Sequence, residues 1–192
     1  GVMRLENLIA DIDEEMFTKI VENRSVRDKD ARDTAKIVGL AAIKYGDLSN
    51  QATKDYIFDI DRFTSFEGNT GPYILYTIVR IKSILNRYVE AGGNLEAGEI
   101  LPASNGSEKN LMLQLSGFGS MIESAFEEKA PHKICAYIYE VSNAFNSFYH
   151  ETKILSEENQ AQKESYIRLL QLTKRVLETS IDLLGFEAPD KM

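Results

Sequence analysis

The sequence has one cysteine, two histidines and no long apolar run, and each shortage excludes a class of protein. Cys135 has no second cysteine with which to form an intrachain disulfide or a zinc site. A membrane span needs roughly 20 consecutive apolar residues, and the N-terminal residues lack the basic-then-apolar layout of a signal peptide. We therefore expect a cytoplasmic protein that does not enter a membrane, with Cys135 as a buried thiol between apolar neighbours.

Sequence signatures of catalysis are also missing. His132 and His150 have no carboxylate or serine near them in a pattern that marks a catalytic dyad. No glycine-rich phosphate loop ends in a lysine, and neither His-x-Gly-His nor Lys-Met-Ser-Lys-Ser occurs. Burial of Cys135 would raise the pKa of its thiol and disfavour a nucleophilic role. We expect this chain to hold no catalytic residue, metal or cofactor of its own.

The chain has no excess of basic residues, because 22 Lys and Arg stand against 30 Asp and Glu, for a formal net charge of −8. Affinity for nucleic acid comes largely from Lys and Arg at the phosphates, so RNA binding would require local basic surfaces. The sequence groups basic residues in three places. These are Arg24, Arg27, Lys29, Arg32 and Lys36; Arg80, Lys82 and Arg87; and Arg168, Lys174 and Arg175.

Apolar residues make up 43% of the 192 residues and recur at helical spacing through most of the chain. Gly117 and Gly119 should interrupt the helix whose core face contains Leu111 and Phe126, and Gly185 should end the last helix at Leu184. We expect the tail after Gly185 to fold back onto the bundle. The expected helices cover about residues 5–21, 28–46, 72–87, 111–126 and 131–151, and a last stretch that ends at 184.

The segment between the second and third of these helices has an alternating pattern that predicts a short extended connector. Asp59 and Asp61, with Glu67, could hold a divalent cation in a metal-dependent enzyme, or they could cap and pair locally. The local role is favoured because no phosphate loop accompanies them. The sum is an all-α protein: a helical bundle over 72–192, preceded over 1–71 by two helices and the connector.

A long helix is expected to begin at Pro72, where Thr70 can cap its first turn. Turning its residues by about 100° per step separates two stripes. One stripe is apolar and should face the core: Ile74, Ile78, Ile81, Leu85 and Tyr88. The second stripe lies beside it: Tyr73, Tyr76, Arg80, Ser83 and Arg87.

Two interpretations of the second stripe are open. Tyrosine rings one turn apart, followed by arginines, offer flat surfaces for nucleotide bases and guanidinium groups for phosphates. Alternatively, both tyrosines are half-buried packing residues whose hydroxyls reach water. Binding of RNA requires Tyr73, Tyr76 and Arg80 to share an exposed edge of the helix, so burial of all three would exclude it.

Ordered sequence blocks extend beyond this helix. Residues 42–49, 55–59 and 66–73 resemble the junction of arginyl-tRNA synthetases, and residues 131–151 resemble a signature of the family's anticodon-binding bundle. Residues 1–9 are similar to the segment after the family's Lys-Met-Ser-Lys-Ser-type loop, and residues 183–192 are similar to its C-terminus. The resemblance covers most of the chain and identifies it as a C-terminal fragment.

The resemblance implies a function that the isolated chain cannot perform alone. The whole class I enzyme uses ATP, with Mg²⁺, to attach arginine to its tRNA, and the bundle, named after an Asp-Ala-Leu-Arg-like motif, binds the anticodon loop. It also implies that the protein is a monomer and that its partner is arginine tRNA. It further implies a tRNA-binding role for Tyr73, Tyr76, Arg80, Arg87, Tyr149, His150 and Met192.

The implied roles follow from the side chains: tyrosines would stack on unstacked bases, Arg80 would hold a phosphate or a base edge, and Met192 would close a pocket around a base. Leu75, Thr77 and Ile78 depart from the Gln, Ala and His that many members have at those positions. A competing hypothesis is a helical protein-interaction module that uses its apolar faces and acidic surface and does not bind nucleic acid.

Overall fold

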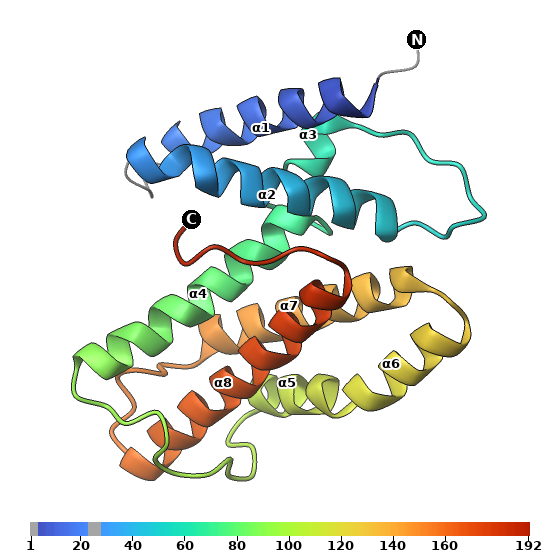
Figure 1. Ribbon diagram of the computed structural model, residues 1–192. Helices are drawn as coiled ribbons and strands as arrows, with labels where there is room; N and C mark the ends of the chain where they lie inside the picture. Colours follow the sequence, from blue (N-terminus) through green and yellow to red (C-terminus); the bar gives the residue numbers. More distant parts are fainter. Residues whose placement is uncertain (1–3, 23–27) are drawn as a thin grey trace.

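The computed structural model describes residues 4–22 and 28–192, and this part of the chain contains helices and no strand (Figure 1). Arg24 and Arg27, from the first predicted basic group, lie outside the described residues. No helix of the described part is long and apolar enough to cross a membrane. The helices are α1 (Leu5–Glu22), α2 (Asp28–Leu48), α3 (Ile60–Phe63), α4 (Gly71–Glu90), α5 (Gly106–Ser116), α6 (Phe118–Glu127), α7 (Pro131–Glu151) and α8 (Gln160–Leu183).

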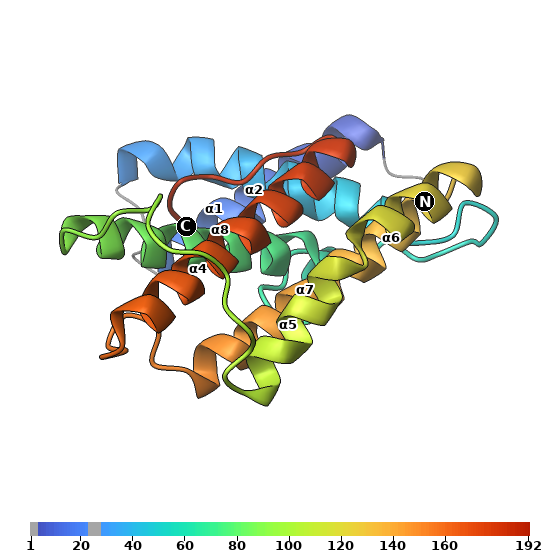
Figure 2. The same ribbon diagram turned by 90° about the horizontal axis from the view of Figure 1, so that it is seen from below.

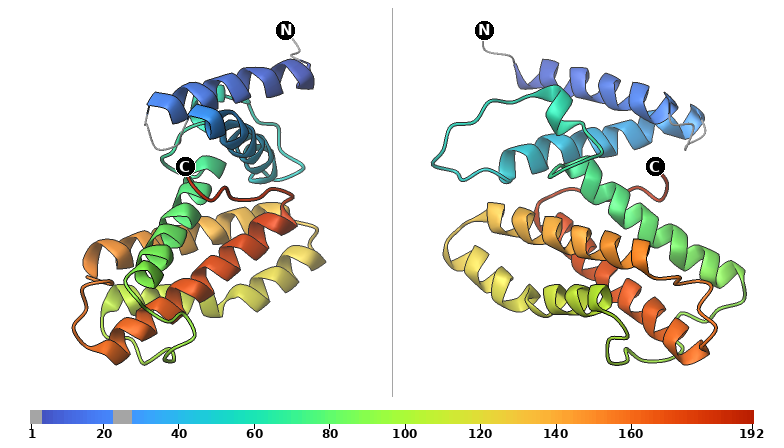
Figure 3. Two further views of the ribbon diagram at one scale, coloured as in Figure 1. Left: turned by 60° about the vertical axis from the view of Figure 1, so that its left-hand side comes forward. Right: turned by 180° about the vertical axis from the view of Figure 1, so that it is seen from behind.

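The helices form a bundle preceded by a helix pair, as the sequence predicts. The antiparallel pair α1 and α2 lies across one end of a bundle made by α4, α7, α8 and the broken helix α5–α6 (Figures 1 and 3). Figure 2 shows α5 and α6 following the length of α7 while α8 crosses beside α4. Gly117 separates α5 from α6, which confirms the break expected there.

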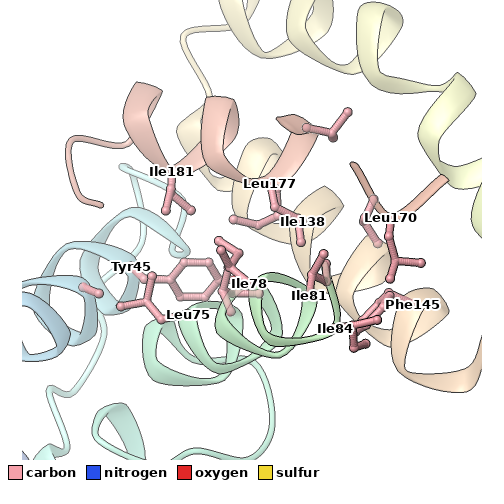
Figure 4. Packing of buried hydrophobic residues seen from close by; sticks show 14 of the residues in the cluster. Tyr45, Leu75, Ile78, Ile81, Ile84, Ile138, Phe145, Leu170, Leu177 and Ile181 are labelled. Carbon is pink, nitrogen blue, oxygen red and sulfur yellow. The ribbon is translucent and has the colours of Figure 1, made fainter. Parts of the chain in front are cut away.

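The interior of the bundle is built from the predicted apolar stripes. Every member of the α4 core stripe is buried, and Ile78 and Ile81 have no exposed surface. Figure 4 shows them meeting Ile138 from α7 and Leu177 from α8. Contacts between stripes on different helices supply most of the stability of such a bundle, because an isolated helix is marginal in water.

Tyr45 of α2 joins the helix pair to the bundle. Its ring is fully buried beside Leu75 (Figure 4), and its hydroxyl lies 2.8 Å from the carbonyl oxygen of Cys135 on α7 and 2.5 Å from Oδ1 of Asn69. Burial raises the pKa of this hydroxyl well above its ordinary value. Tyr45 therefore stays neutral and keeps its partners when the two parts pack together.

The C-terminal tail folds back as expected. Phe186 is buried, Lys44 of α2 donates to the carbonyl oxygen of Gly185 at 2.6 Å, and Lys82 of α4 donates to that of Pro189 at 3.3 Å. Gly185 has a φ of 82°, a left-handed conformation that glycine adopts without steric cost. The tail thus crosses α4 beside α2 and contacts both parts of the structure (Figure 1).

One expectation about the core is wrong. Phe126, assigned by spacing to the core face with Leu111, is 83% exposed, whereas Leu111 is fully buried. The break at Gly117 separates the two residues into different helices, so the spacing no longer places them on one face. The apolar repeat is continuous in the sequence, but the helix is not.

The long loop before α5 is irregular, and side-chain hydrogen bonds anchor it. Ser165 of α8 accepts from the backbone N–H of Leu101 at 2.9 Å. The carboxylate of Glu108, fully buried, accepts from the backbone N–H of Ser104 at 2.6 Å. These contacts hold the loop against α5 and α8.

Candidate functional site

The first turn of α4 sets the direction of the candidate site. Thr70 accepts a hydrogen bond from the backbone N–H of Tyr73 at 3.2 Å, and Pro72 occupies the first turn, where its missing N–H costs nothing. With this start fixed, the second stripe of α4 lies beside the outer side of α7. Tyr73, Tyr76 and Arg80 are therefore brought next to Asn146 and Tyr149.

Tyr73 is a half-buried member of the stripe. Its hydroxyl donates to Oδ1 of Asn143 at 2.8 Å and accepts from Nδ2 of Asn146 at 2.9 Å. Its ring packs edge-on against Tyr139, with centroids 5.8 Å apart. Burial raises the pKa of the Tyr73 hydroxyl, so it remains a neutral donor. Tyr73 is thus half-buried, and its packing role agrees with the second interpretation of the stripe.

Tyr76 and the half-buried Arg80 form the outer edge. Tyr76 is 39% exposed, and its hydroxyl accepts a hydrogen bond from Nη2 of Arg80 at 3.0 Å. The other guanidinium nitrogen donates to Oδ1 of Asn146 at 2.6 Å. The Cζ atom of Arg80 lies 4.6 Å from the centroid of the Tyr76 ring and 5.2 Å from that of Tyr149, within cation–π range of both. The guanidinium is held by two rings and an amide at the surface.

The end of α7 completes this edge. Tyr149 is half-buried and stacks on Phe145, with ring centroids 6.1 Å apart and planes inclined by 26°. His150 is exposed and meets the Tyr149 ring edge-on, with centroids 5.6 Å apart. Arg87, also exposed, lines an open groove together with Tyr149 and His150. Arg87 and His150 therefore extend the surface that begins at Tyr76.

Met192 is not joined to this surface by the contacts of the described residues. It is half-buried against the core at the end of the tail. The tail is held by Lys82, which projects about 200° around α4 from Arg80 at about 100° per residue. The structure thus brings Tyr73, Tyr76, Arg80 and Tyr149 together, and leaves Met192 on the tail.

Sequence reasoning missed two residues of the site, Asn143 and Asn146. Asn146 contacts both Tyr73 and Arg80, and Asn143 fixes the Tyr73 hydroxyl. A signal was present, because these asparagines follow Tyr139 at the three- and four-residue spacing that lines up one face of a helix. Asparagine on a helix surface is common, so this pattern indicates a site only once the structure places it beside the α4 stripe.

The other candidate sites have structural explanations. Cys135 is fully buried, and burial raises the pKa of its thiol to about 12, so it is not a nucleophile near neutral pH. Asp59 caps α3 by accepting from the backbone N–H of Arg62 at 3.1 Å. Throughout residues 4–22 and 28–192, no group of three His, Cys, Asp or Glu side chains is arranged to hold a metal ion.

The departures from the arginyl-tRNA synthetase pattern fall inside the bundle. Leu75, Thr77 and Ile78 have no exposed surface. Leu75 and Ile78 face the core, whereas the Thr77 hydroxyl accepts a hydrogen bond from Nδ2 of Asn146 at 3.4 Å and so adjoins the site.

Comparison with known proteins gives relatives along the entire chain. The arginine–tRNA ligase of Agathobacter rectalis is 66% identical over 200 aligned residues, which cover 100% of this chain and 34% of the relative. That of Alkaliphilus oremlandii is 53% identical over 100% of this chain and 32% of its own length. The chain therefore spans about a third of the length of the curated relatives it matches.

Solved structures and a family model agree with these relatives. Thermus thermophilus arginyl-tRNA synthetase is 26% identical and superposes with a TM-score of 0.90. The match covers 100% of this chain and 33% of the Thermus thermophilus chain. The Plasmodium falciparum enzyme is 27% identical, with a TM-score of 0.86 over 100% of this chain and 34% of its own. The family model described as the DALR anticodon binding domain matches residues 74–192, more than half of the sequence. The chain belongs to the DALR anticodon binding domain family.

Proposed function

We propose that this chain is the C-terminal part of an arginine–tRNA ligase and that the outer edge of α4 and α7 binds the anticodon loop of arginine tRNA. The observation on which the proposal depends is the edge formed by Tyr76, which is exposed, with Arg80 and Tyr149, which are half-buried; in it two rings flank one guanidinium. A protein-interaction module is not favoured, because the matched family model describes an anticodon-binding domain.

Each side chain has a distinct role in this proposal. The Tyr76 ring, 39% exposed, offers a face on which an unstacked base can lie. Arg80 directs its remaining N–H groups to a phosphate or a base edge, since Asn146 and Tyr76 occupy only part of its five donors. Tyr149 continues the stacking surface, and Tyr73 supports it from below through its hydrogen bonds to α7.

Three further residues are proposed at the margins of the surface. Arg87 and His150 are exposed next to Tyr149 and can reach the RNA beside the stacked bases. Met192 would have to contact RNA from the tail, on another face of α4. Its role in closing a pocket around a base requires the bound RNA to pass from the tyrosines toward the tail.

The activity proposed for the full-length protein follows from its relatives. With ATP and Mg²⁺ it would attach arginine to tRNA, and this chain would supply recognition without catalytic residues or a cofactor of its own. We propose a division at residues 71 and 72, supported by the family match that begins at residue 74. We propose that the full-length protein is a cytoplasmic monomer.

Binding of two tRNAs tests the proposal. The full-length protein should bind arginine tRNA more tightly than the same tRNA with altered anticodon bases. Substitution Tyr76→Ala should reduce that difference, because removal of one stacking ring costs about 1–3 kcal/mol of binding free energy. Equal affinity of the unaltered protein for both tRNAs would refute anticodon recognition.

A further inference from the structure

Two open grooves meet at the end of the bundle where α4 and α7 finish and α8 begins (Figures 1 and 3). The first groove passes Tyr149 and His150, and Lys153 lies on its wall. The second runs over the end of α4 to Lys163 in the first turns of α8. Arg87 and Leu155 line both grooves, so the two adjoin at these residues.

The side chains of these grooves have a charge opposite to that of the whole chain. Arg87, Lys153 and Lys163 line them together with a single carboxylate, Glu151, in a protein whose formal net charge is −8. None of the ion pairs that the described residues form includes any of these three cations. Their charges are therefore available to a ligand.

The grooves also continue the proposed RNA surface. The centroid of the Tyr149 ring lies 5.2 Å from Cζ of Arg80, and Tyr149 also lines the first groove. A nucleotide chain whose bases stack at Tyr76 and Tyr149 would have its backbone directed past His150 toward Arg87. Nucleotides are linked by phosphates, so the polymer that leaves the stacking surface presents a negative charge at each step along the grooves.

We propose that Arg87, Lys153 and Lys163 form a phosphate track, a second binding site for the RNA backbone beside the base-stacking surface. This inference rests on the proposed function, because it assigns the same RNA to both sites. Lysine ammonium groups act on phosphate as point charges and carry no sequence information. The phosphate track therefore raises affinity for any RNA of suitable shape, while discrimination between anticodons stays with the stacking surface.

The salt dependence of binding tests the track. In the full-length protein, the double substitution Lys153→Ala with Lys163→Ala should weaken binding by the same factor for arginine tRNA and for the anticodon-altered tRNA. It should also reduce the slope of log affinity against log salt by about 1 for each phosphate that the protein no longer neutralises. Restoring charge with Lys153→Arg and Lys163→Arg should restore the slope.

Lys54→Ala is the matched control. Lys54 is exposed on the connector at the opposite end of the molecule (Figure 1), so its removal changes net charge without touching the grooves. An equal fall in slope for Lys54→Ala and for either groove lysine would overturn the track in favour of a general charge effect, and so would an unchanged slope in the double variant. Neither result bears on the ratio of affinities for the two tRNAs. Equal affinity of the unaltered protein for both tRNAs would instead overturn the proposed function.

Discussion

The inner and outer sides of the α4–α7 pair use the same two helices in different ways. On the inner side, Ile78 and Ile138 have no exposed surface and are held by packing alone. On the outer side, Tyr76 and Arg80 are held by hydrogen bonds and ring contacts at the surface. Packing depends on volume, whereas the outer network depends on the direction of each polar group, so the two sides should respond differently to substitution.

This difference has a consequence for recognition. A side chain already fixed in one orientation loses little conformational entropy when a ligand binds, and an immobilised flexible side chain costs about 0.5–1.5 kcal/mol. Asn146 fixes Arg80 by a 2.6 Å hydrogen bond in the absence of a ligand. The rigid inner side is the support that keeps Asn146 in place.

The largest effect is expected on the inner side. Ile78→Ala should lower the free energy of unfolding by about 2–5 kcal/mol, because it leaves a cavity among side chains that cannot fully close it. Urea unfolding followed by circular dichroism measures the change. The matched substitution Ile57→Ala, at a residue 87% exposed, should change stability by less than about 0.5 kcal/mol. Similar losses for both variants would contradict the assigned core.

Tyr76→Ala should produce the opposite pattern, with little loss of stability and a weakening of tRNA binding by about 1–3 kcal/mol. Tyr76→Phe retains the ring and should keep most of the affinity. Tyr56, 38% exposed on the connector, is the control with the same chemistry and nearly the same exposure. Filter binding or fluorescence titration of the full-length variants with arginine tRNA distinguishes them, and equal losses for Tyr56→Ala and Tyr76→Ala would argue against a localised surface.

Asn146→Ala should have a smaller effect, since it removes contacts that orient Arg80 and Tyr73 without removing either side chain. We expect tRNA binding to weaken by about 1 kcal/mol, the usual net contribution of a hydrogen bond. A double-mutant cycle with Arg80→Ala measures the coupling. Additive effects would show that Asn146 does not act through Arg80, and Asn110→Ala, on the exposed side of α5, should leave affinity unchanged.

The smallest effect is expected at Phe126, which spacing alone assigned to the core. Because its ring is 83% exposed, Phe126→Ser should change the free energy of unfolding by less than about 0.5 kcal/mol. Phe145→Ala, at a fully buried ring, should cost about 3–5 kcal/mol in the same urea titration. A decrease above about 1 kcal/mol for Phe126→Ser would mean that its ring is packed in solution.

The helices of the fold could be predicted because local signals in the sequence set their faces and ends. The core stripe of α4, the helix start at Thr70 and the stop at Gly185 are all set by interactions within a few residues. Spacing misplaces Phe126 because the break at Gly117 changes the angular relation between residues on either side. The side chain of Asp59 was expected to cap or pair locally, and it caps α3.

The sequence by itself determined which residues share a face of each helix, because the 3.6-residue repeat fixes that without reference to the rest of the chain. It also placed Tyr76 and Arg80 on one line of α4. Only the tertiary structure decided that this line meets Asn146 and Tyr149 of α7, because residues about 70 positions apart are brought together by the packing of whole helices, and no local pattern specifies which faces meet.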